Sequence, residues 1–81
     1  MTYSPELIAE IELLALFNLA NTQEGLKVHQ SATPEAIAAA ARLHEKELIT
    51  RPDGGYLTSL GLDAAEHAQS LVTILRTAQT A

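Results

Sequence analysis

Apolar residues recur at spacings of three and four in three stretches of the chain, which is the period of an amphipathic helix. Each stretch follows a residue that caps helices well: Ser4, Thr33 and Thr58. A Ser or Thr hydroxyl accepts a hydrogen bond from a backbone N–H of the first helical turn. Proline follows the first two caps, at a position where its missing N–H costs no hydrogen bond. The pattern therefore predicts helices over residues 5–20, 34–47 and 59–77.

The first and last of these helices have wide apolar surfaces. Only four polar residues interrupt residues 5–20, so this helix is expected to be buried on more than one side. It is therefore a central helix, a dimer interface or both. The last helix has an apolar stripe, which indicates either core packing or a helix–helix dimer seam. The stripe consists of Ala64, Ala68, Leu71, Leu75 and Ala78.

Residues 48–58 have the pattern of a β-hairpin. Two short strand candidates, 48–51 and 56–58, flank the sequence Pro-Asp-Gly-Gly. Proline fixes φ, aspartate bonds to nearby backbone and glycine adopts positive φ, so this sequence predicts a tight turn. Two isolated strands are unstable in water. The hairpin is therefore expected to close the core with Ile49, Tyr56 and Leu57.

Residues 22–29 leave two alternatives open. Leu26 and Val28 alternate with Lys27 and His29, as in a strand, whereas Asn21 or Thr22 can cap a short helix. The predicted fold is mainly α with a small β-hairpin. It forms one domain over residues 1–81, with three main helices and either a short fourth helix or a third strand at 22–29.

Composition narrows the classes of protein. The chain has 81 residues, of which 47% are hydrophobic, so it is folded and forms one domain. It has no cysteine, which excludes disulfides and thiolate metal sites. No stretch approaches the roughly 20 apolar residues of a membrane span, and the first residues lack the basic region of a signal peptide. We therefore expect a cytoplasmic protein.

Catalytic and metal-binding motifs are not found in the sequence. It has no GxSxG, HExxH or P-loop pattern, and its His and acidic residues pair only two at a time at helical spacing. A domain of this size also has little room for a ligand pocket of several hundred Å³. We expect no enzyme activity, no cofactor, no metal and no small-molecule substrate.

The charges are unevenly distributed. The formal net charge is −5, which opposes binding to nucleic acid. The basic residues nevertheless concentrate in residues 25–51, the one segment suited to face an anion. They are Lys27, Arg42, Lys46 and Arg51. Arg42 and Lys46 share one helical face at a spacing of four, either as part of a basic patch or in ordinary pairs with neighbouring glutamates.

The order of elements over residues 33–67 resembles the C-terminal half of winged helix-turn-helix domains. In these domains the recognition helix often ends in a phrase of the form L.EKGLI, which here is Leu43-His44-Glu45-Lys46-Glu47-Leu48-Ile49, with Glu47 in place of glycine. The whole chain also resembles a family of short uncharacterised proteobacterial proteins. The first resemblance implies a DNA-binding fold, and the second implies a bacterial origin and no mechanism.

Two functions follow as hypotheses. The first is a DNA-binding, transcription-regulator-like module that contacts duplex DNA. Its candidate nucleic-acid-binding residues are Lys27, Thr33, Arg42, Lys46 and Arg51. The N-terminal half of helix 34–47 lacks the Arg, Lys, Asn and Gln side chains that read base edges. The alternative is therefore a protein-interaction or self-association module on the same scaffold, a homodimer through helix 5–20, helix 59–77 or both.

Overall fold

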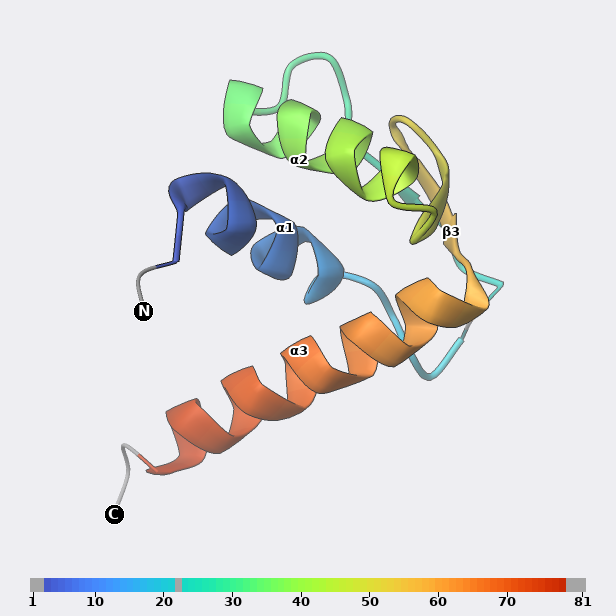
Figure 1. The fold of residues 1–81 in the computed structure, drawn as a ribbon. Helices are drawn as coiled ribbons and strands as arrows, with labels where there is room; N and C mark the ends of the chain where they lie inside the picture. The colour runs from blue at the N-terminus through green and yellow to red at the C-terminus, as the bar shows by residue number, and fades with distance from the viewer. Residues whose placement is uncertain (1–2, 22, 79–81) are drawn as a thin grey trace.

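The computed structural model describes residues 3–21 and 23–78. Three helices and a small antiparallel sheet make up the fold, as predicted, and the arrangement is compatible with a winged-helix-like topology (Figure 1). The elements are α1 (Pro5–Leu14), β1 (Leu26–Lys27), α2 (Pro34–Glu45), β2 (Ile49–Arg51), β3 (Gly54–Leu57) and α3 (Ser59–Ala78). Among the described residues, no helix is both long and apolar enough to span a bilayer.

All three predicted helix caps are present. The Ser4 hydroxyl accepts a hydrogen bond from the backbone N–H of Leu7 at 3.1 Å. Thr33 accepts one from Ala36 at 3.2 Å. Thr58 caps α3 in the same way, with the N–H of Gly61 3.0 Å from its Oγ1. The helix starts predicted from these residues are therefore confirmed.

The prediction that the first helix continues to residue 20 is wrong, because α1 ends at Leu14. Asparagine side chains compete with the helix beyond that point: Asn18 Oδ1 accepts from the N–H of Ala20 at 3.0 Å. Phe17 lies in this turn and packs into the core, with 5% of its surface exposed. Gln69 on α3 donates to the Phe17 carbonyl at 2.6 Å, so a side chain from a distant helix satisfies the backbone of this turn.

The second helix also ends two residues earlier than predicted, at Glu45. Glu47 adopts a left-handed conformation, with φ of 65°. Its N–H donates to the His44 carbonyl at 3.0 Å, and that of Leu48 donates to the Leu43 carbonyl at 2.9 Å. These two bonds form a Schellman motif, in which the left-handed position is usually glycine. The third helix runs one residue beyond its predicted end, to Ala78.

The sheet has the strand order β1-β3-β2, with β3 antiparallel to both neighbours. Strand β1 decides the open alternative at residues 22–29 in favour of a strand. Thr22, the other candidate cap, lies outside the described residues. The hairpin is confirmed, but its strands are 49–51 and 54–57 and not 48–51 and 56–58, so the turn itself is Pro52-Asp53. Gly54 and Gly55, predicted in the turn, begin β3 and have positive φ, 125° and 79°.

The core lies where α1, α2, β2 and α3 meet, with α1 between the other two helices (Figure 1). Ile49 is fully buried and Leu57 packs against the core, as expected. The expectation that Tyr56 closes the core is wrong, since it is 46% exposed. Helix α3 approaches the backbone of Leu48 closely at Gly61, where a Cβ atom would lie 1.8 Å from the Leu48 carbonyl oxygen.

Replacing Glu47 with glycine is expected to stabilise the fold by about 1 kcal/mol. A left-handed L-residue costs about 1–2 kcal/mol, and the entropy that glycine loses on folding offsets part of the gain. Urea unfolding followed by circular dichroism measures the difference. Glu45→Gly is the matched control, because the same exchange inside the last turn of α2 should destabilise by about 1 kcal/mol. Equal loss of stability in both variants would contradict the interpretation.

Candidate interaction surfaces

The contact between α1 and α2 is organised around one buried carboxylate. Glu10 on α1 is only 5% exposed. Its Oε2 accepts from Arg42 Nε at 3.0 Å, and its Oε1 accepts from Lys46 Nζ. Arg42 also donates through Nη2 to the backbone carbonyl of Glu6 at 3.0 Å. Because Arg42 and Lys46 are four residues apart on α2, both side chains reach the same point of α1.

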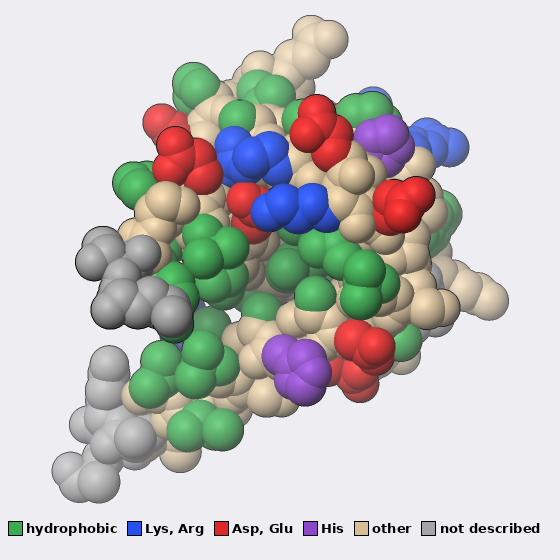
Figure 2. Space-filling model, viewed as in Figure 1, with side chains coloured by type: hydrophobic (Ala, Val, Ile, Leu, Met, Phe, Trp, Pro, Cys, Tyr) green, Lys and Arg blue, Asp and Glu red, His purple; other side chains and the backbone are tan. Residues whose placement is uncertain are grey.

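The electrostatics of this cluster favour the ionised carboxylate. Burial alone would raise the pKa of Glu10, but hydrogen bonds and charge from Lys46 and Arg42 outweigh it, so the pKa lies below its ordinary value. The Lys46 side chain is 53% exposed and that of Arg42 is 29% exposed. On the face shown in Figure 2, acidic side chains lie among the basic ones. Both cations therefore serve first to join α2 to α1.

The five candidate nucleic-acid-binding residues do not form one patch. Thr33 uses its hydroxyl to cap α2, and Arg42 and Lys46 hold Glu10. Lys27 and Arg51 lie on the sheet instead, each in register with Gly54 of the central strand. The pairing of β2 with β3 is irregular between Ile49 and Arg51, so this register does not place the two side chains on one face of the sheet.

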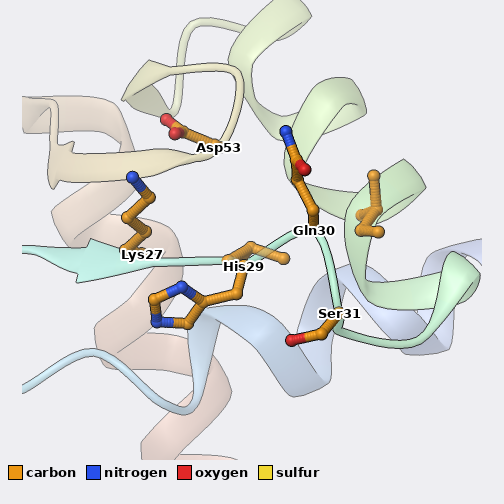
Figure 3. A pocket seen from close by; sticks show the side chains of 7 residues that line it. Lys27, His29, Gln30, Ser31 and Asp53 are labelled. Carbon is orange, nitrogen blue, oxygen red and sulfur yellow. The ribbon is translucent and has the colours of Figure 1, made fainter.

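An open hollow of about 620 Å³ adjoins Lys27. It is lined by Lys27, Val28, His29, Gln30, Ser31, Ile37 and Asp53. Lys27 extends toward the turn that carries Asp53, whereas His29 and Ser31 point away from it (Figure 3). The polar groups do not converge on one point, and within residues 3–21 and 23–78 no three His, Asp or Glu side chains are placed to hold a metal ion.

Sequence reasoning missed how α3 divides its apolar residues along its length. Gly61, Ala65 and Ala68 are buried against the core. The large side chains that follow them in the predicted stripe are not: Leu71 is 54% and Leu75 56% exposed. Small residues make the intramolecular contact, and the helix carries its large residues outside it. The sequence alone does not show this division, because it depends on how closely each part of α3 packs against the core.

Exposed apolar residues on α1 extend this surface. Leu7 is 38% and Ile8 46% exposed, and Ile74 on α3 reaches 63%. Hydrophobic side chains gather along both helices, with a hollow between them on the face shown (Figure 2). We call the five residues Leu7, Ile8, Leu71, Ile74 and Leu75 the α1–α3 apolar surface.

Comparison with known proteins places the chain in a family. Residues 1–76 match the model described as "Family of unknown function (DUF5669)". The chain belongs to this family. No curated protein and no solved structure matches it. The match confirms the predicted membership of a small uncharacterised family, and DUF5669 brings no activity, ligand or partner with it.

The lowered pKa of Glu10 makes the fold sensitive to acid. A depressed carboxyl pKa contributes stability above the unfolded pKa of about 4.3, and this is lost as pH falls through the folded value. Glu10→Gln is expected to cost about 2 kcal/mol at pH 7, since it leaves two partly exposed cations unpaired.

Urea unfolding at pH 7, 5 and 3 checks this expectation. The difference between the native chain and Glu10→Gln should shrink as the pH falls through the folded pKa. Glu12→Gln serves as the control, because Glu12 lies on the same helix and is exposed. A stability difference for Glu10→Gln that does not change with pH would show that the carboxylate charge is not what joins the helices.

Proposed function

We propose that this protein is a non-catalytic self-association module that forms a homodimer through the α1–α3 apolar surface. The observation that carries the proposal is the exposure of Leu71, Ile74 and Leu75 on one side of α3. Ile74 and Leu75 follow Leu71 by three and four residues, which places all three on one side of a helix with 3.6 residues per turn. Leu60, which is 58% exposed, continues the same side near the start of α3.

The size of the hydrophobic gain supports a weak, concentration-dependent dimer. Complete burial of a Leu or Ile side chain contributes about 1.5–3 kcal/mol, so a half-exposed one has roughly 1 kcal/mol left to gain. A symmetric pair buries ten such side chains, five from each copy, for a gross gain of about 10 kcal/mol. Association costs about 4–15 kcal/mol in lost freedom. The two quantities are comparable, which is typical of a dimer that dissociates on dilution.

The small core is a second reason for association. Among the described residues, the largest fully buried side chains are those of Leu43 and Ile49. A domain of this length buries a modest fraction of its surface and gains stability from a partner. A second copy supplies apolar area that the single chain lacks.

Sedimentation equilibrium over the micromolar to millimolar range tests the proposal. We expect a monomer–dimer equilibrium, and Leu75→Glu should raise the dissociation constant at least about tenfold, since it places a charge in the seam. Leu16→Glu is the matched control, because Leu16 is 66% exposed but lies outside the α1–α3 apolar surface. A chain that stays monomeric at millimolar concentration would refute the proposal.

Duplex DNA is a second candidate ligand, favoured by one observation. Lys27 and Arg51 lie on the two outer strands of the sheet, both paired with Gly54 of β3. No ion pair engages either cation within the described part of the chain. Cations on the outer strands of one sheet can contact phosphates, which would be a sequence-independent mode of binding.

A fluorescence titration with duplex DNA at several salt concentrations tests this second candidate. Replacing both Lys27 and Arg51 with alanine should reduce the slope of log K against log salt by about 2, one unit for each phosphate contact. Arg76→Ala is the control, since Arg76 is an exposed cation at the far end of α3. Absence of binding at low salt would eliminate DNA as a ligand.

A further inference from the structure

The charges beside the α1–α3 apolar surface indicate which surfaces of the two copies meet. Resting on the proposed self-association, we infer that the C-terminal half of α3 in one copy docks on the exposed face of α1 in the other. Two-fold symmetry repeats the contact, because each copy offers both an α1 face and an α3 face. The competing arrangement packs α3 against α3.

Helix α1 presents an acidic surface beside its apolar residues. Its sequence, PELIAEIELL, contains three glutamates and no base. Glu10 is buried and paired with Arg42 and Lys46, but Glu6 and Glu12 are exposed on either side of it. A partner that covers Leu7 and Ile8 therefore meets two carboxylates at the rim of the contact.

The C-terminal half of α3 has the opposite character. Residues 67–78 contain His67 and Arg76 and no acidic residue. Docking α3 on the α1 of the second copy brings Arg76 toward Glu6 or Glu12.

Packing α3 against α3 in parallel instead brings the two Arg76 side chains together, and like charges across an interface suppress a pairing. An antiparallel α3 pair brings Arg76 toward Glu66 of the second copy, one carboxylate in place of the two that α1 offers. Charge complementarity therefore favours the α3-on-α1 arrangement.

The lengths of the helices allow α3 of one copy to dock on α1 of the other. At 1.5 Å per residue, α3 with its 20 residues is about 30 Å long, whereas α1 with 10 residues is about 15 Å long. The two helices diverge toward the chain termini (Figure 1). On the face seen in Figure 2, hydrophobic side chains lie on both sides of a hollow between the two helices. Leu7 and Ile8 are exposed on α1, so a helix from the second copy can contact them without displacing the core.

Disulfide trapping distinguishes the two arrangements. The native chain has no cysteine, so single replacements report on one position each. A chain with Ile8→Cys and a mass-tagged chain with Leu75→Cys are mixed and mildly oxidised. We expect the mixed disulfide between the two chains to exceed either homodisulfide. Glu45→Cys, at an exposed position on α2, gives the background rate of random collision.

A dominant Leu75→Cys homodisulfide would overturn the inferred arrangement while leaving the proposed self-association intact. A monomer in sedimentation would instead remove both. A mixed disulfide no more abundant than the Glu45→Cys background would also overturn the arrangement. The readouts therefore separate failure of the docking geometry from failure of the dimer itself.

Charge reversal provides an independent test of the same contact. Arg76→Glu should weaken the dimer roughly two- to fivefold, the usual range for an exposed pair, and Glu6→Lys with Glu12→Lys in the same chain should restore it. Glu66→Lys is the control, since Glu66 is an exposed acid on α3 outside residues 67–78. Weakening by Arg76→Glu without rescue would contradict pairing with α1.

Discussion

The buried Glu10 carboxylate is the interaction on which the arrangement of the helices depends. It draws Arg42 and Lys46 of α2 onto α1 and so fixes the angle and register of the central helix pair. A buried charge is expensive unless it is paired, so the two cations are needed for the helix to lie there at all. The same contact turns Ile8, on the far side of α1, toward solvent. One ion cluster thus determines both the packing inside the domain and the surface that it offers.

The cluster also changes the meaning of the basic residues. A linear sequence shows Arg42 and Lys46 four residues apart and cannot show that a carboxylate 36 residues from Lys46 lies between them. Arg42 and Lys46 are therefore engaged mainly by Glu10 inside the fold. The basic residues left to contact a ligand are Lys27 and Arg51 on the sheet and Arg76 on α3. Fold resemblance alone favours DNA, whereas the placement of charge and apolar area favours a second protein chain, and function follows the site.

Local chemistry made much of the fold predictable. The caps at Ser4, Thr33 and Thr58 and the presence of the hairpin depend on neighbouring residues only, and all were predicted correctly. The end of α1 was not, because the turn that follows it is held by Gln69, 52 residues away from Phe17, as well as by Asn18. The burial of Glu10 and the exposure of Leu71 were missed for the same reason. Periodicity identifies an apolar side of a helix, but the closeness of the neighbouring element decides which part of that side is covered.

Helix α3 touches the core through Gly61, Ala65 and Ala68 and leaves Leu71 and Leu75 exposed. Contact through small residues brings the α3 backbone close to the rest of the domain, but it buries less hydrophobic area per residue. In the proposed dimer the second copy supplies the additional buried apolar area. The free energy of association therefore adds to the stability of the folded chain. Thermal stability then rises with protein concentration by mass action. The abundance of the chain would thereby set the fraction that is folded, without any ligand or modification.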